Sequence, residues 1–128
     1  DECPVRFSNW EVDQARTTAR ELLELSKPPS AIFCANDTIA ACLLQVANEL
    51  NIKVPGELSV VGMTNERMSQ LTIPSLTTVG IPGEEIGHAG MMALIELIES
   101  KREVTTQEIM RYPCSPVFRD SSAAASPL

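Results

Sequence analysis

The feature that most constrains the fold of this chain is a continuous apolar run at residues 31–35. Pro28 and Pro29 precede the run, and Asn36 and Asp37 follow it, so turn and cap residues bound it on both sides. A short run without polar alternation is typical of a strand that is covered on both faces, as in a parallel sheet. Because Asn and Asp are favoured helix N-caps, we predict a strand that leads directly into a helix.

Strands and helices continue to alternate along the rest of the chain. Apolar residues at helical spacing predict helices over 11–26, 36–50 and 83–98. Short apolar or β-branched runs predict strands at 58–61 and 76–81, with one or two more within 108–119 and a further candidate at 4–7. Such alternation builds βαβ units with right-handed crossovers. The predicted fold class is therefore α/β, with a parallel sheet that carries helices on both faces.

Composition excludes several classes of partner. The chain has 128 residues, enough for one domain or a piece of a larger one, and its 44% hydrophobic and 21% charged residues are typical of a soluble globular protein. Its net charge of −7 repels phosphate, so this segment is not expected to bind nucleic acid or an anionic membrane. No apolar run approaches the roughly 20 residues of a membrane span, and no signal peptide opens the chain.

The four cysteines do not form a metal-binding pattern. Cys3, Cys34, Cys42 and Cys114 have no CxxC spacing, so we predict no zinc site. Cys34 and Cys42 lie among apolar residues and are interpreted as small buried hydrophobes. Reduced thiols indicate a cytoplasmic protein, although the sequence leaves a Cys3–Cys114 disulfide open.

No catalytic motif is present in the sequence. It lacks GxSxG, HExxH, P-loop and GxGxxG patterns, and its one histidine, His88, has no nucleophile or acid placed beside it. The pair Glu84 and Glu85 is explained by the dipole of the helix that it opens. We therefore predict a protein that is not an enzyme and that has no catalytic residue, no cofactor and no metal.

The carboxyl ends of the predicted strands are the expected place for a ligand, because open parallel sheets bind ligands there. The residues at these ends are 36–37, 63–66 and 80–83. Asn36 has two interpretations: it caps the following helix, or it offers its amide to a polar ligand. Trp10 also has two interpretations: it is a hydrophobic anchor, or it is an aromatic wall on which a sugar or purine ring stacks.

Five motifs together resemble the effector domain of the LacI/GalR family of bacterial transcription repressors. They are AIFCAND, VPGELSVVG, SLTTV, EEIG and FRDSS, in this order between residues 31 and 122. The resemblance implies that residues 1–119 form the C-terminal portion of a periplasmic-binding-protein-like effector domain, mainly its second lobe. Residues 82–100 would be a helix that packs on the first lobe, and 120–128 a disordered tail. A helix-turn-helix headpiece would lie in another part of a protein more than twice this length.

The resemblance also assigns candidate ligand contacts. Asn36 falls on a family position that hydrogen-bonds the effector, and Trp10 on one that is aromatic in some members. Thr64 falls where the family usually has an Asp that holds sugar hydroxyls, with Asn65 beside it as a substitute, and Ile81 falls where several members have a polar residue. With Asp37 as a further strand-end candidate, the implied pocket is less polar than a sugar site.

The sequence therefore predicts the effector-sensing and dimerisation part of a LacI/GalR-type repressor in the cytoplasm. A small-molecule effector, sugar-like or another metabolite, would bind at strand ends between the two lobes of the effector domain. The protein would be a homodimer. DNA would be contacted only through the headpiece, and no membrane would be bound. The alternative is a fragment of a periplasmic sugar- or solute-binding protein of an ABC transporter, which requires a signal peptide. An enzyme on a doubly wound sheet is the third possibility.

Overall fold

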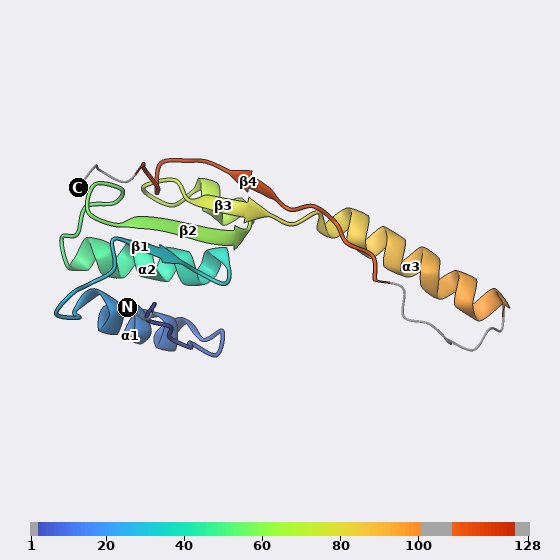
Figure 1. Cartoon of the computed structure of the whole chain (residues 1–128), viewed down its shortest axis with the longest axis horizontal. Helices are drawn as coiled ribbons and strands as arrows, with labels where there is room; N and C mark the ends of the chain where they lie inside the picture. Colours follow the sequence, from blue (N-terminus) through green and yellow to red (C-terminus); the bar gives the residue numbers. More distant parts are fainter. Residues whose placement is uncertain (1–2, 101–108, 125–128) are drawn as a thin grey trace. The chain divides into compact units, whose positions relative to one another are not determined.

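The structure is a computed structural model that describes residues 3–100 and 109–124. The chain divides into two compact units, one made of residues 1–80 with 116–128 and the other of Ile81–Ser115. Each unit is described by itself. The elements, in chain order, are α1 (Val12–Leu23), β1 (Ala31–Phe33), α2 (Asp37–Glu49), β2 (Ser59–Thr64), the 3₁₀ helix η1 (Arg67–Gln70), β3 (Thr77–Gly80), α3 (Gly83–Ser100) and β4 (Ser115–Val117) (Figure 1).

The strands form one sheet in the order β1-β2-β3-β4. Strands β1, β2 and β3 are parallel, with Ala31 beside Ser59 and Val61 beside Thr77. The chain then returns past β3 in the opposite direction, since Asp120 follows Arg119 and donates its N–H to the carbonyl of Ser75, which precedes β3. The predicted α/β class with a parallel sheet is confirmed.

Helix α2 supplies most of the core of the first unit. Its sequence alternates small and large aliphatic residues, so one side of the helix packs closely on β2. Burial alternates along the strands: side chains such as Ile32 and Val60 face the helix, as the pleat of a sheet requires. The buried cluster contains Ala19, Leu23, Cys34, Ala40, Leu43, Leu44, Val46, Ala47, Leu58, Val60 and Leu76.

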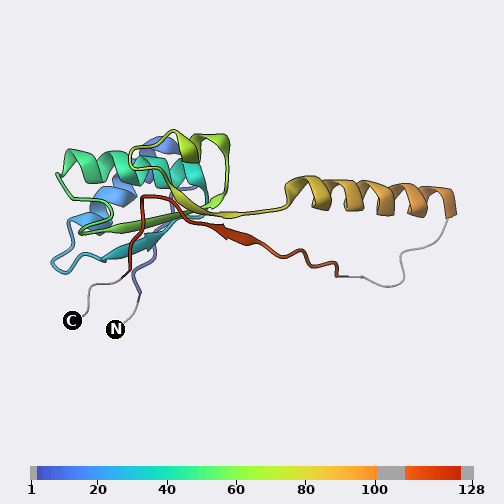
Figure 2. The ribbon, with the colours of Figure 1, turned by 90° about the horizontal axis from the view of Figure 1, so that it is seen from above.

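Both helices of the first unit lie on the same face of the sheet, which corrects the prediction of helices on both faces. Helix α1 packs against α2 and adds Ala19 and Leu23 to the same core, and Figure 2 shows both helices on one side of the strands. The strand order gives the reason. The chain moves from β1 to β2 to β3 in one direction, so right-handed crossovers place α2 and η1 on one side, and α1 packs on α2 there.

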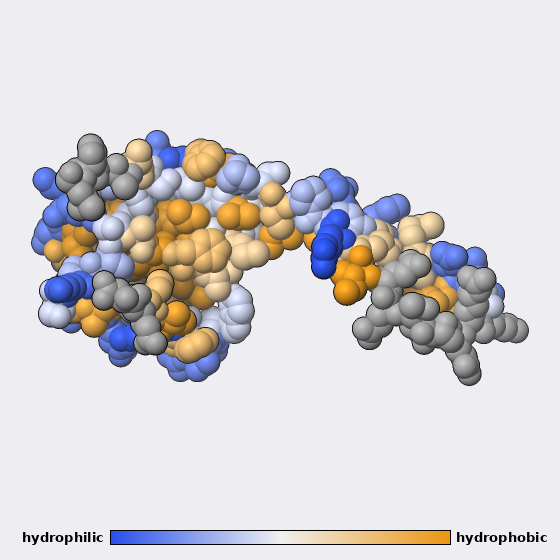
Figure 3. Space-filling model, viewed as in Figure 1, coloured by the Kyte–Doolittle hydropathy of each residue, from blue (hydrophilic) through white to orange (hydrophobic). Residues whose placement is uncertain are grey.

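Among the described residues of this unit, no helix covers the other face of the sheet. Phe33 on this face is 62% exposed, and Val61 and Val79 are only half-buried. Figure 3 shows the apolar surface on the side that faces the viewer. An uncovered apolar face of this kind marks a site of interaction.

Three further predictions, on residues 4–7, on the end of α1 and on the C-terminal tail, are corrected by the structure. Residues 4–7 form no strand, and α1 ends at Leu23 rather than near Ser26. The predicted disordered tail is wrong for its first residues, because Ser121 is fully buried: its hydroxyl donates to the carbonyl of Val60 and accepts the N–H of Thr77. Residues 125–128 lie outside the described part of the chain.

The second unit contains helix α3. The sequence predicts an inward apolar face for this helix, yet none of its residues is buried. Ile98 is 68% exposed, and Met91 and Leu94 are 57% and 50% exposed. Across the described ranges, no helix has the length and apolarity needed to cross a membrane.

Candidate functional site

Asn36 lies at the carboxyl end of β1 and caps helix α2. Its backbone is extended, with φ −154°, and its side-chain Oδ1 accepts the N–H of Ile39 at 2.8 Å. The capping interpretation is therefore confirmed. Among the described residues, none accepts a hydrogen bond from the Asn36 side-chain NH₂, and the residue is half-buried. A ligand contact by Asn36 stays a prediction.

Asp37 is placed differently from the prediction that it contacts a ligand. It is 0% exposed, and both carboxylate oxygens have partners inside the protein. Oδ1 accepts the hydroxyl of Thr78 at 2.6 Å, and Oδ2 accepts the N–H of Glu66 at 2.7 Å. Because Thr78 belongs to β3 and Glu66 follows β2, this carboxylate ties three strand ends together.

Gly62 makes room for the Asp37 carboxylate. A Cβ added at Gly62 would lie 2.3 Å from Asp37 Oδ1 and 2.9 Å from Leu76 Cδ2, distances that real Cβ atoms do not show. The Gly that ends the predicted strand at 58–61 therefore has a packing reason. It allows the buried carboxylate to pass close to β2 and reach Thr78 on β3.

The loop after β2 has an unusual backbone. Thr64 has φ 105° and Asn65 has φ 54°, both on the left-handed side that only Asn and Gly adopt readily. The N–H of Asn65 donates to Thr78 Oγ1 at 3.3 Å, and the Thr64 hydroxyl donates to Glu66 Oε1 at 3.3 Å. Backbone strain of this kind clusters at ligand sites, because the surrounding contacts must hold it in place.

Arg119 is the residue that sequence reasoning missed. Its Nη2 donates to Asn65 Oδ1 at 2.8 Å, while Nη1 donates to Ser69 Oγ at 3.0 Å and to the carbonyl of Leu76 at 2.7 Å. The motif FRDSS marks its position, yet a separation of 54 residues from Asn65 hides the contact from any local pattern. Arg119 therefore joins the loop after β2 to the start of β3.

The remaining two predicted contacts are Trp10 and Ile81. Trp10 is 69% exposed, with φ 65°, which excludes the hydrophobic-anchor interpretation. It lines an apolar cavity of about 640 Å³ between the N-terminal segment, α1 and β1, which Asn36 and Asn65 do not line. Ile81 follows β3 directly and is the first residue of the second unit. The structure thus brings together Asn36, Asp37, Thr64 and Asn65 at the strand ends.

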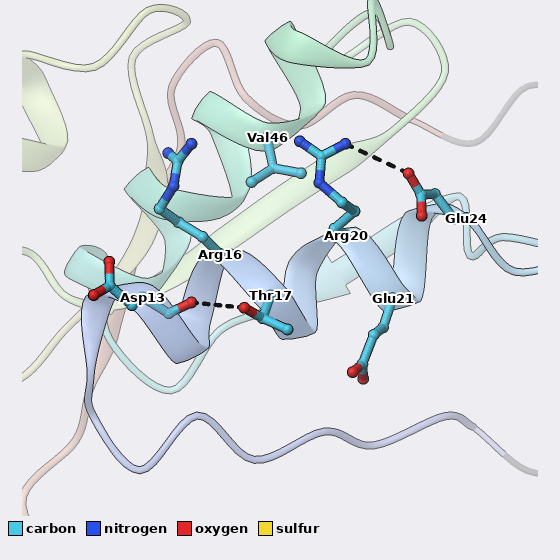
Figure 4. Close-up of a pocket in the computed structure, with 7 residues that line it drawn as sticks. All are labelled: Asp13, Arg16, Thr17, Arg20, Glu21, Glu24 and Val46. Carbon is cyan, nitrogen blue, oxygen red and sulfur yellow. Dashed lines mark hydrogen bonds and ion pairs between the residues drawn. The ribbon is translucent and has the colours of Figure 1, made fainter.

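A second concave surface, between α1 and α2, has a structural explanation. This groove of about 440 Å³ is lined by Asp13, Arg16, Thr17, Arg20, Glu21, Glu24 and Val46 (Figure 4). Arg20 donates to Glu49 Oε2 at 2.7 Å, and Arg16 pairs with the other oxygen of the same carboxylate. The Arg16 guanidinium lowers the pKa of Glu49, whose carboxylate in turn raises the pKa of Arg16. The Glu49 carboxylate of α2 thus pairs with two guanidiniums of α1.

The cysteines and acidic residues offer no metal centre in the described ranges. No group of three or more His, Cys, Asp or Glu side chains converges there. Cys3 and Cys114 are exposed free thiols, so the disulfide that the sequence left open is not formed in this structure. Burial raises the pKa of Cys34 to about 12, which keeps this thiol protonated and inert.

Comparisons with known proteins agree with this geometry. Residues 2–122 match the periplasmic binding protein-like domain. The transcriptional repressor CytR of Escherichia coli K12 is 33% identical over 105 residues, which are 82% of this chain and 30% of CytR. A LacI-family regulator from Burkholderia phymatum has a TM-score of 0.75 at 32% identity, over 91% of this chain and 42% of that one. A LacI-family regulator from Enterococcus faecium with bound ribose has a TM-score of 0.76 at 25% identity, over 89% and 41%.

This chain spans about a third of the length of the curated relatives that it matches. The resemblance to the LacI/GalR regulators is confirmed, both in sequence and in fold. The match to the family covers almost every residue of the chain, including all of the strand-end loops. The chain belongs to the family of periplasmic binding protein-like domains.

Proposed function

We propose that this chain is the effector-sensing part of a LacI/GalR-type DNA-binding transcriptional repressor. The observation that carries the proposal is the strand-end surface of the first unit. There, Asn36, Thr64 and Asn65 lie around a buried carboxylate that holds a strained loop in place. The relative CytR is a transcriptional repressor, and a LacI-family transcriptional regulator was solved with bound ribose. Both findings favour a repressor over the solute-binding protein of a transporter.

The proposed activity is binding and not chemistry. A small metabolite would contact the strand ends and shift the equilibrium between two arrangements of the effector domain. The affinity of the DNA-binding part of the protein for its operator would change by the same coupling free energy. Trp10 and Ile81 are proposed as further contacts. Asp37 is proposed as a positioning residue, because both of its carboxylate oxygens are engaged inside the protein.

Self-association belongs to the same proposal. The net charge of −7 leaves this chain unsuited to DNA, so a separate headpiece would make the DNA contact, and a homodimer would present two of them. Helix α3 has the exposed apolar surface that association requires. The proposed location is the cytoplasm, where DNA is read.

The test is operator binding in the presence of metabolites. The full-length polypeptide would be titrated onto DNA from its own promoter region, with fluorescence anisotropy as the readout. A panel of sugars, nucleosides and nucleobases would follow at millimolar concentration. We expect one compound class to change the operator affinity at least fivefold. Specific DNA binding that no compound alters, or no DNA binding at all, would contradict the proposal.

A further inference from the structure

The two asparagines of the strand-end surface use their side-chain oxygens inside the protein. Asn36 Oδ1 accepts the N–H of Ile39, and Asn65 Oδ1 accepts Nη2 of Arg119. A side-chain amide has one oxygen that accepts and one NH₂ that donates, so fixing the oxygen also fixes where the donor points. No described residue accepts a hydrogen bond from either NH₂ group. Each amide therefore has its donor side free.

Asn65 is held more tightly than an exposed asparagine normally is. Its N–H donates to Thr78 Oγ1, and Thr78 in turn donates to the buried carboxylate of Asp37. The next N–H along the chain, that of Glu66, donates to the same carboxylate. Backbone and side chain of Asn65 are thus both tied down, although the residue lies at the surface.

The Arg119 guanidinium fixes the amide of Asn65 from the other side. It reaches Asn65 Oδ1, Ser69 Oγ and the carbonyl of Leu76 together. A planar guanidinium can hold three acceptors in a fixed geometry, which the single ammonium of lysine cannot reproduce. A guanidinium has only donors, so it can bind the oxygen of the Asn65 amide. With the amide flipped, the NH₂ group would face the donors of Arg119, and no hydrogen bond could form.

We propose that the strand-end surface recognises its effector through hydrogen-bond acceptors on that effector, which meet the NH₂ groups of Asn36 and Asn65, and that Arg119 is the positioning residue for Asn65. The effector class is a metabolite with a carbonyl oxygen or an unprotonated ring nitrogen. Such atoms only accept hydrogen bonds, whereas each hydroxyl of a plain sugar accepts but also brings a proton that needs an acceptor. This inference rests on the proposed function and specifies the chemistry of its site. In the same loop, the Glu66 carboxylate accepts the hydroxyl of Thr64.

Isosteric substitutions separate recognition from folding. Asn65→Asp keeps an oxygen for Arg119 and gains an ion pair, yet it replaces the free NH₂ by a carboxylate oxygen. Asn36→Asp keeps the helix cap, since Asp caps as well as Asn. Asn48→Asp makes the same charge change on the exposed end of α2 and is the matched control. All three variants are expected to fold, and urea unfolding would verify it.

The experiment measures ligand-induced thermal stabilisation and calorimetric affinity of the full-length polypeptide with ribose, uridine and N-acetylglucosamine. We expect uridine or N-acetylglucosamine, which carry carbonyl acceptors, to bind more tightly than ribose. Asn36→Asp and Asn65→Asp should each weaken that binding about tenfold or more. The NH₂ donor is lost, and a carboxylate oxygen, which repels the acceptor of the probe, takes its place. The Asn48→Asp variant should bind as the wild type does.

Arg119→Lys supplies a readout that a structural role would not change. Freeing the Asn65 amide to rotate should reduce the preference for carbonyl probes over ribose about threefold or more, a ratio that global destabilisation leaves constant. Two results would overturn this inference and leave the proposed function standing. One is a carbonyl probe that binds Asn36→Asp and Asn65→Asp as tightly as the wild type, and the other is ribose bound more tightly than both carbonyl probes. Operator binding that no compound of the wider panel alters would overturn the proposed function instead.

Discussion

At the residue scale, the strand-end surface depends on one buried carboxylate. Asp37 accepts hydrogen bonds from Thr78 and Glu66 and thereby holds the left-handed backbone of Thr64 and Asn65. The sequence predicted that Asn36 and Asp37 open a helix, which is a local property. It could not predict that the Asp37 side chain is buried, because its partners lie 29 and 41 residues away.

Gly62 provides a direct test of this packing. Gly62→Ala places a methyl group against Asp37 Oδ1 and Leu76, and overpacking of this kind costs about 1–3 kcal/mol. We expect urea unfolding to show this loss in the free energy of unfolding. Gly56→Ala is the control, since its new Cβ would meet nothing closer than 3.6 Å. Equal stability of the two variants would contradict the account of Gly62.

The thiols form a second residue-scale prediction. Cys3 and Cys114 are exposed, whereas Cys34 and Cys42 are buried with raised pKa values. A disulfide reagent such as DTNB at pH 8 should therefore react quickly with two thiols and slowly with the other two. All four should react at once in urea. Four equal rates in the native protein would show that the core around Cys34 is open.

At the element scale, sequence periodicity located most helices and strands but not their layers. The apolar run at 31–35 contains β1, and the predicted strands at 58–61 and 76–81 overlap β2 and β3. Helices on both faces were not found, because the strand order runs in one direction and right-handed crossovers place α2 and η1 on one side. Strand order is a long-range property that periodicity does not encode.

Contact between α1 and α2 gives a pH-dependent prediction. The pKa of Glu49 is lowered in the folded state, so the stability from its pairing with Arg16 and Arg20 is present above the ordinary value of 4.5 and is lost as pH falls through the lowered pKa. Glu49→Gln should lower the thermal midpoint slightly at pH 7. It should also flatten the dependence of the midpoint on pH below 4.5.

The control for this experiment is Glu11→Gln. The side chain of Glu11 makes no ion pair or hydrogen bond with the described residues, so this variant should keep the pH dependence of the wild type. If Glu49→Gln and Glu11→Gln gave superimposable curves, the ion pairs between α1 and α2 would contribute nothing to stability.

At the scale of the whole molecule, both units expose apolar surface. One face of the sheet is uncovered, and α3 has no buried residue. The sequence predicted an inward face for α3 from its periodicity, which reports amphipathicity but cannot name the surface that covers it. The burial of Ser121 was likewise missed, because its partners Val60 and Thr77 come from distant strands.

Self-association through α3 follows from this exposure. We expect sedimentation velocity at tens of micromolar to show a dimer or larger species. Leu94→Glu with Ile98→Glu should shift the distribution toward the monomer, because two charges on an apolar contact disfavour its burial. The double variant Glu96→Gln with Glu99→Gln, which leaves the apolar residues of the same helix unchanged, is the control and should keep the wild-type distribution. A monomeric wild type at these concentrations would contradict the prediction.

The central claim is that the strand ends of the first unit form the wall that contacts the effector, and amide NMR mapping tests it most directly. The full-length polypeptide, labelled with ¹⁵N, would be titrated with the compound that changes operator binding. We predict that the largest shift changes fall on the backbone and side-chain amides of Asn36, Asn65 and Glu66. Changes confined to the groove of Arg16 and Arg20 between α1 and α2, with the strand ends unmoved, would contradict it.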